Sequence, residues 1–128
     1  RSAVQEIVTV NDLIFVVTRS GVCTVFEEGT LETVAQLNLQ RDESIRSLFY
    51  NPCDESMLTA STYRGDGYRS LVLRSTKIAD IKEREHSRYQ YLFEAEHLGQ
   101  ESFVEFSADA QVILTYNGKS RYVSAFCS

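Results

Sequence analysis

The chain is dominated by short apolar, β-branched runs, interrupted by polar turn residues about every eight to twelve residues. The first round of this pattern predicts strands at residues 4–10, 13–18, 22–27 and 33–39. Tight turns join them, as at Asn11-Asp12 and Glu28-Gly29-Thr30. Strands connected in this way predict one antiparallel sheet of four strands.

The same order begins again after a polar link and then a third time. The second round predicts strands at 45–50, 57–62, 68–75 and 89–94, and the third at 103–106, 111–116 and 121–127, with no fourth run. One stretch, 76–87, breaks the rhythm. Because Ile78 and Ile81 lie three residues apart within it, a short helix or a charged insertion is expected there.

Two hairpins show that the rounds are a true repeat. Segments 50–59 and 106–115 align residue for residue: an aromatic residue, a small polar turn containing Asp, then an apolar strand ending in Thr. The first two rounds recur at about the 40 to 45 residues typical of WD repeats. We therefore predict an all-β fold of antiparallel four-stranded β-propeller blades, with a β-sandwich as the alternative.

This prediction divides the chain into parts of a single propeller domain. The blades are expected at about 4–39, 45–94 and 103–128, the last incomplete, which makes about two and three-quarter blades. Both ends are expected to be cuts through a longer protein, because the sequence stops within an apolar run. Three runs of continuous apolar character are expected to be inner strands buried on both faces. They are 13–17, 57–60 and 112–114.

Five segments have a more particular sequence: 45–51, 54–59, 73–76, 103–106 and 112–116. They resemble a plant and protist family of transducin-like, WD-repeat-like proteins. The similarity extends over most of the chain and is weakest at 1–10 and 77–100. The sequence lacks Trp, so it has no Trp-Asp dipeptide, and it also lacks a Gly-His pair. The resemblance implies a degenerate propeller without an established enzymatic activity and assigns no catalytic residue.

Charge and hydropathy exclude some partners. The chain has 13 basic and 18 acidic residues and a formal net charge of -5, which does not favour a nucleic-acid backbone. No apolar run approaches the roughly 20 residues that a membrane-spanning helix needs. Cys23, Cys53 and Cys127 have no metal-binding or disulfide-framework spacing and are expected to be free thiols. Free thiols favour an intracellular location, cytoplasmic or nuclear.

No reacting group or cofactor site stands out. His86 lies near Glu83 and Glu85, but in a charged stretch that is expected to face solvent, so no metal site is predicted. The sequence contains no Gly-x-Ser-x-Gly elbow, and the glycines of Gly65-Asp66-Gly67 lack the third glycine of a dinucleotide cradle. No cofactor is expected, and neither is a small-molecule ligand.

Tyr and Arg are concentrated around the 63–68 loop and after the charged stretch. These residue types are enriched at the energetic centres of protein interfaces. The candidate protein-binding residues are Tyr63, Arg64, Tyr68, Arg69, Arg88 and Tyr89. The alternative is that the tyrosines pack on the strands and that the arginines cover apolar surface at a blade edge.

The predicted function is a non-catalytic protein–protein interaction or structural scaffold module. Its partner would be another protein or the remainder of the propeller. The alternative is an enzyme whose axial pocket is completed by blades outside this chain.

Overall fold

The computed structural model describes residues 3–68, 70–95, 103–106, 111–116 and 119–124, with side chains up to residue 92. Its first sheet has the order β1-β2-β3-β4. The strands are β1 (Val4–Val10), β2 (Leu13–Thr18), β3 (Cys23–Glu27) and β4 (Thr33–Gln36), and all neighbours are antiparallel. This is the four-stranded meander that the turn pattern predicts.

The second sheet repeats the arrangement in the order β5-β6-β7-β8. Its strands are β5 (Glu43–Asn51), β6 (Ser56–Tyr63), β7 (Leu71–Lys77) and β8 (Tyr89–Ala95). Strands β9 (Phe103–Phe106), β10 (Gln111–Tyr116) and β11 (Lys119–Ser124) form a third antiparallel sheet. The fold is all-β, and its four-stranded antiparallel sheets are propeller-like blades.

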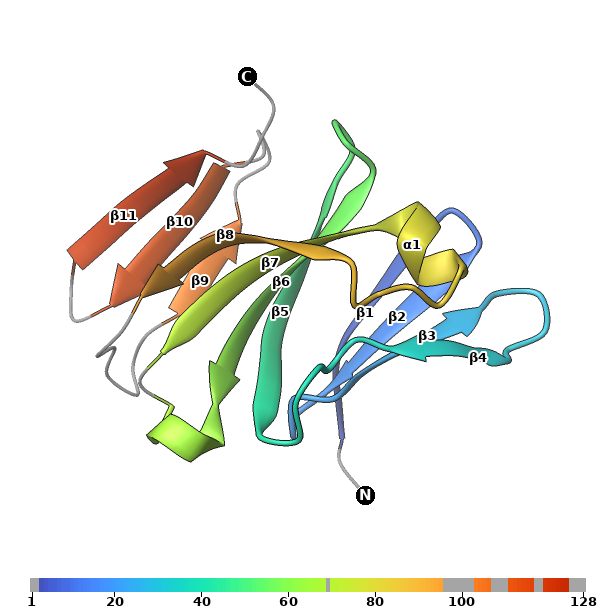
Figure 1. Cartoon of the computed structure of the whole chain (residues 1–128), viewed down its shortest axis with the longest axis horizontal. Helices are drawn as coiled ribbons and strands as arrows, with labels where there is room; N and C mark the ends of the chain where they lie inside the picture. The colour runs from blue at the N-terminus through green and yellow to red at the C-terminus, as the bar shows by residue number, and fades with distance from the viewer. Residues whose placement is uncertain (1–2, 69, 96–102, 107–110, 117–118, 125–128) are drawn as a thin grey trace.

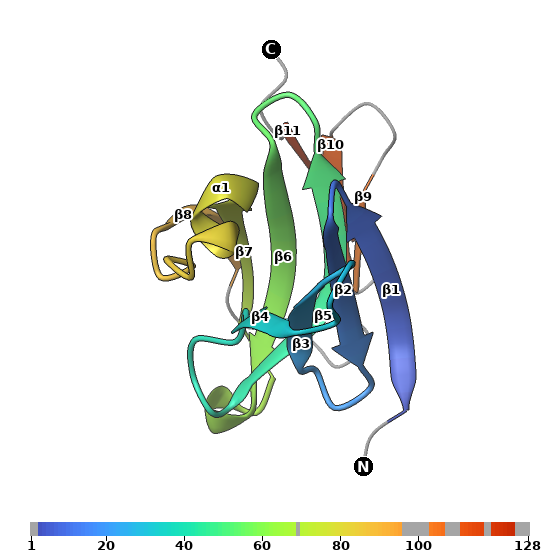
Figure 2. The same ribbon diagram turned by 90° about the vertical axis from the view of Figure 1, so that its right-hand side faces the viewer.

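The three sheets stand side by side in chain order, from β1–β4 on the right of Figure 1 to β9–β11 on the left. In the side view of Figure 2, β1 and β2 lie in front of β5, and β6 and β7 lie beside β5. Most of the buried apolar side chains form one cluster between the first and second sheets. From the first sheet it takes residues such as Phe15, Val17 and Val25, and from the second Ile45, Leu48 and Met57.

Strands β2 and β6 differ in burial, although both were expected to be buried on both faces. Residues 56–61 of β6 are all buried, as predicted for this strand. In β2 the prediction is wrong, because burial alternates: Phe15 and Val17 are fully buried, whereas Ile14 and Val16 are only half-buried. The second sheet covers one face of β2, and the described residues leave its other face partly open. The segment 112–114 has no described side chains.

The helix α1 (Ile78–Lys82) occupies the stretch that interrupts the strand rhythm. It is not simply a charged surface element, because Ile78 and Ile81 are buried in the cluster between the sheets. Lys82 Nζ lies 2.8 Å from Asp12 Oδ1 in the β1–β2 turn, and Arg84 Nε donates to the Val34 carbonyl at 3.1 Å. Thus α1 fastens the end of β7 to the first sheet. No helix in the described part of the chain is long and apolar enough to cross a membrane.

The loop between β6 and β7 contains a single 3-10 turn, η1 (Arg64–Asp66), at the opposite end of the second sheet from α1 (Figure 1). The strand register requires this separation. Ser56 at one end of β6 pairs with Lys77, just before α1, whereas Tyr63 at the other end precedes η1. The 63–68 loop and Arg88, which were grouped as protein-binding candidates, therefore lie at opposite ends of the second sheet.

The cysteines do not match the expectation in full. Cys23 is free and buried, as predicted. Cys53 is disulfide-bonded, so its assignment as a free thiol is wrong. The spacing of cysteines along the sequence could not indicate this bond, because a disulfide depends on proximity in space. Cys127 lies outside the described residues, and the argument for a reducing compartment does not hold for Cys53.

Candidate functional site: an arginine groove above a buried ion pair

A buried ion pair links β5 and β7 of the second sheet, next to the linker that follows β4. Arg74 Nη1 lies 2.6 Å from Glu43 Oε2, and the two side chains are 2% and 0% exposed. The register of the strands explains why these two side chains meet. Glu43 pairs with Tyr63 and Arg74 with Thr59, and since Thr59, Ser61 and Tyr63 alternate along β6, all of these side chains share one face.

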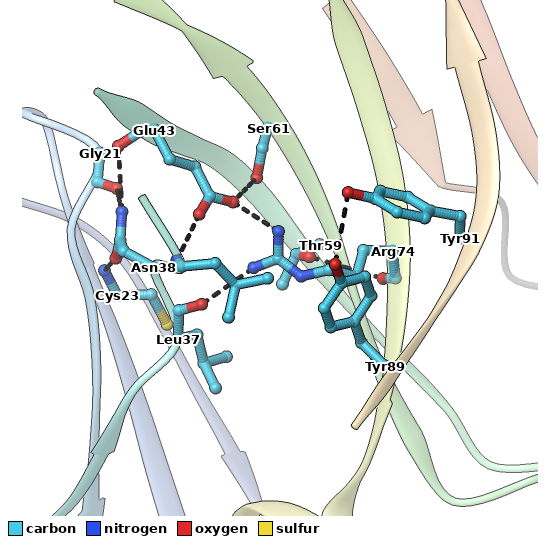
Figure 3. Close-up of polar contacts among 11 residues, drawn as sticks. Gly21, Cys23, Leu37, Asn38, Glu43, Thr59, Ser61, Arg74, Tyr89 and Tyr91 are labelled. Carbon is cyan, nitrogen blue, oxygen red and sulfur yellow. Dashed lines mark hydrogen bonds and ion pairs between the residues drawn. The ribbon is translucent and has the colours of Figure 1, made fainter. Parts of the chain in front are cut away.

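Both charged groups are hydrogen-bonded beyond their own contact. Glu43 Oε2 also accepts from Ser61 Oγ at 2.6 Å, and its Oε1 accepts from the Leu39 N–H at 2.6 Å. Arg74 Nη2 donates to the Leu37 carbonyl at 2.9 Å. Such satisfaction is what makes a buried ion pair tolerable, because each ion loses several kcal/mol of solvation on burial. The pair thereby fixes linker 37–39 against the second sheet (Figure 3).

Asn38 extends the same connection to the first sheet. Its Nδ2 donates to the carbonyls of Gly21, at 2.9 Å, and Glu43, at 3.0 Å. Its Oδ1 accepts from the Cys23 N–H at 2.9 Å. One amide thus bridges the β2–β3 turn, β3 and the start of β5, as Figure 3 shows. The linker is held by side-chain bonds on both sides.

Aromatic residues flank the outer side of Arg74. The ring of Tyr89 lies over the guanidinium, with its centroid 5.5 Å from the carbon, and meets Tyr91 edge-on at 5.0 Å (Figure 3). Tyr91 is 57% exposed. On the same face, burial, with a smaller contribution from the charge of Glu43, raises the pKa of Tyr63 to about 12.

Above this network lies an open hollow of about 410 Å³, which we call the arginine groove. Three segments line it: the β2–β3 turn, residues 36–46 from the end of β4 into β5, and the β6–β7 loop. Its lining residues are Arg19, Ser20, Val22, Gln36, Asn38, Gln40, Arg41, Asp42, Glu43, Ser44, Arg46, Arg64 and Tyr68. The groove holds four exposed arginines, and of its two carboxylates Glu43 is already neutralised by Arg74.

Close backbone approach brings these three segments together. Gly21 has a φ of +89°, and a Cβ there would lie 2.6 Å from the Ser44 Cα. A Cβ on Gly65 would lie 2.6 Å from Asp42 Oδ2, which accepts the Gly65 N–H at 2.9 Å. Only glycine allows such approaches without displacing a neighbour. The Arg64 N–H further donates to the Asp42 carbonyl at 2.9 Å.

The structure separates the candidate residues predicted from sequence. Arg64 and Tyr68 line the arginine groove, and Tyr63 and Tyr89 share the face of the second sheet that carries Arg74. Arg88 follows α1 at the far end of the sheet, exposed and 4.0 Å from Glu85. Arg69 lies outside the described residues.

Sequence reasoning missed the arginines that come from other segments. Arg19, Arg41 and Arg46 belong to turns and a strand far from the 63–68 loop along the chain, so a local search for Tyr and Arg could not group them. It also missed Glu43 and Arg74, whose ion pair depends on strand register. Within the described residues, no group of three or more His, Cys, Asp or Glu side chains could hold a metal ion.

Together, the repeated four-stranded sheets and the short linkers define an all-β protein with propeller-like blades. Among families, the chain belongs to DUF7899, a domain of unknown function, whose model matches residues 1–126. No curated protein matches the sequence.

Two solved structures of designed proteins align with the chain. The computationally designed protein Ika8 aligns with a TM-score of 0.53 and 13% identity, over 94% of this chain and 33% of its own. The chain therefore spans about a third of the length of that design. The designed protein Ika4 aligns over 98% of this chain and 92% of its own, with a TM-score of 0.46 and 12% identity. At such identities the likeness to Ika8 concerns the fold alone.

Proposed function

We propose that this chain is part of a degenerate, WD-repeat-like propeller that acts as a non-catalytic protein-interaction or scaffold module, with the arginine groove as its binding surface. The observation that carries the proposal is the groove itself: four exposed arginines from three separate segments, over a floor that hydrogen bonds tie to both sheets. Arg is enriched at the energetic centres of protein interfaces. Binding surfaces on loops that a rigid scaffold positions are the usual arrangement in such folds.

The fixed floor supports a binding role because it reduces the cost of ordering on association. The linker beneath the groove is tied by Glu43, Arg74 and Asn38 to both sheets. A preorganised surface loses less conformational entropy when it binds than a flexible one. This favours a surface that receives a partner without large rearrangement.

Charge reversal in the groove tests the proposal. The full-length protein would be expressed in cells as wild type and as Arg41→Glu/Arg64→Glu, cross-linked, and its bound proteins identified by mass spectrometry. We expect a reproducible set of partners to be lost from the variant but retained by Arg88→Glu, which changes an exposed arginine at the far end of the sheet. Equal recovery from wild type and the groove variant would overturn the proposal, as would equal loss from the Arg88→Glu control.

A further inference from the structure

We infer that the arginine groove receives an acidic peptide segment, in which several Asp or Glu carboxylates lie close together along an extended chain of the partner protein. The inference rests on the proposed function and specifies the chemistry of its ligand. It follows from the pairing, the conformation and the surroundings of the groove arginines.

Within the described part of the chain, no carboxylate forms an ion pair with a groove arginine. The ion pairs among the described residues are Arg74 with Glu43, Lys82 with Asp12, and Arg88 with Glu85. None of them involves Arg19, Arg41, Arg46 or Arg64. The one unpaired carboxylate in the groove, Asp42, accepts the Gly65 N–H and so holds the β6–β7 loop in place. The guanidinium groups remain available to a carboxylate supplied by a ligand.

One of these arginines is held in position before any ligand arrives. Arg46 Nε donates to Thr62 Oγ1 at 3.1 Å, and its guanidinium lies over the Tyr68 ring, 5.6 Å from the centroid. Stacking on an aromatic face leaves the outward N–H groups of a guanidinium free to bind a carboxylate through two parallel hydrogen bonds. Arg46 is therefore oriented for recognition rather than extended at random into solvent.

Tyr68 adopts this position at a conformational cost. Its φ is +62°, in the left-handed region that a residue with a bulky side chain rarely occupies. Its N–H donates to the Tyr63 carbonyl at 2.9 Å, which keeps the loop closed. The closed loop places the ring on which the Arg46 guanidinium stacks.

The difference in charge between the groove and the whole chain indicates which kind of ligand the groove binds. The chain carries a formal net charge of -5, so its overall field does not attract polyanions such as nucleic acids. A local group of arginines in a hollow of about 410 Å³ suits a short anionic segment. Acidic-motif recognition by Arg clusters is an established mode of peptide binding. The walls come from three segments, so one extended peptide could contact all three.

The test measures binding of a defined peptide by fluorescence anisotropy. The probe is a fluorescein-labelled peptide of alternating Glu and Gly residues, added to the full chain, with a Gln–Gly peptide as the uncharged control. We expect Arg41→Gln/Arg64→Gln to weaken binding of the Glu–Gly peptide about tenfold, as loss of two charge-assisted contacts at an exposed site predicts. Arg88→Gln should leave the dissociation constant within about twofold of wild type. Thermal melts of all variants establish that they are folded.

Each outcome decides the inference. Equal binding of the Glu–Gly and Gln–Gly peptides would overturn it, as would binding that Arg41→Gln/Arg64→Gln leaves unchanged. Tighter binding of a single-stranded DNA oligonucleotide than of the Glu–Gly peptide, lost in the same variant, would assign the groove to a different class of ligand. If the cross-linked partners still depend on the groove while the Glu–Gly peptide does not bind, the acidic ligand is rejected and the proposed interaction surface stands.

Discussion

The buried Arg74 and the exposed arginines of the groove lie near one another but differ in their surroundings. Arg74 is buried, with its charge matched by Glu43, and its Nη1 and Nη2 donate to the Glu43 carboxylate and the Leu37 carbonyl. The arginines above it, such as Arg41 and Arg64, are exposed, and none of them forms an ion pair with any of the described residues. A buried charge needs a partner within the fold, so the Arg74 charge stabilises the structure and is not available to a ligand. An exposed charge remains available to a partner.

The largest effect is expected from breaking the buried pair. Glu43→Gln leaves the Arg74 charge without its counter-ion, and should lower the free energy of unfolding by about 3–5 kcal/mol. Urea denaturation measures the loss. Glu32→Gln is the matched control, because Glu32 is exposed, and it should stay within about 0.5 kcal/mol of wild type.

A double-mutant cycle with Arg74→Met sharpens this result. The double variant should be less destabilised than the sum of the single variants, because each single change leaves the other group buried without its partner. Strict additivity would show that the two charges act independently, which contradicts the role given to the pair.

The next effect concerns the close approach of the β2–β3 turn to β5. Gly21→Ala introduces a Cβ that would lie 2.6 Å from the Ser44 Cα, at a φ of +89°. We expect a loss of about 1–3 kcal/mol in unfolding free energy, measured by urea denaturation. Gly29→Ala is the control, since its nearest contact would be Glu27 Oε1 at 3.8 Å. Equal effects of the two changes would mean that the approach at Gly21 does not constrain the groove.

At neutral pH a smaller effect is expected from the buried thiol of Cys23, beside the linker, because it appears only as pH rises above about 9. Burial raises the pKa of Cys23 to about 12, above its ordinary value of 9.0. Between these values the unfolded chain has lost the proton that the folded chain retains, so stability falls as pH rises. The slope from this group is at most about 1.4 kcal/mol per pH unit.

Cys23→Ala isolates this contribution. The unfolding free energy of the variant should fall less steeply with pH than that of wild type between pH 9 and 12. Comparing slopes separates the titration from the packing lost with the sulfur. Parallel curves for the two proteins would contradict a titrating Cys23.

The strands were predicted well because the apolar runs and the turn residues that determine them are both local features of the sequence. Alternating apolar runs and turn residues such as Asn11-Asp12 specify the meander of β1 to β4 without reference to distant parts of the chain. Burial of β2 was predicted less well, since a continuous apolar run does not reveal how many neighbours will cover it. The disulfide at Cys53 could not be predicted either, because it depends on proximity in space.

The candidate site was predicted only in part, for the same reason. Arg64 and Tyr68 are close in sequence and were grouped with each other, but the partners that complete the groove arrive from other turns. Arg88 was grouped with them by composition, although strand register places it at the opposite end of the sheet. Register is a tertiary property, so a pattern of residue types could not supply it.

The smallest effect on stability is expected from the groove itself. Arg41→Gln/Arg64→Gln removes two exposed charges without ion-pair partners in the described structure, and so should change the unfolding free energy by no more than about 0.5 kcal/mol. Urea denaturation of this variant beside Glu43→Gln compares exposed and buried charge in one protein. A loss of several kcal/mol would show that these arginines hold the three segments together, and any binding defect would then have a structural cause. Unchanged stability makes a loss of peptide binding attributable to the arginine charges, because the Asp42 carbonyl and carboxylate, which accept the Arg64 and Gly65 N–H groups, hold the β6–β7 loop in place without them.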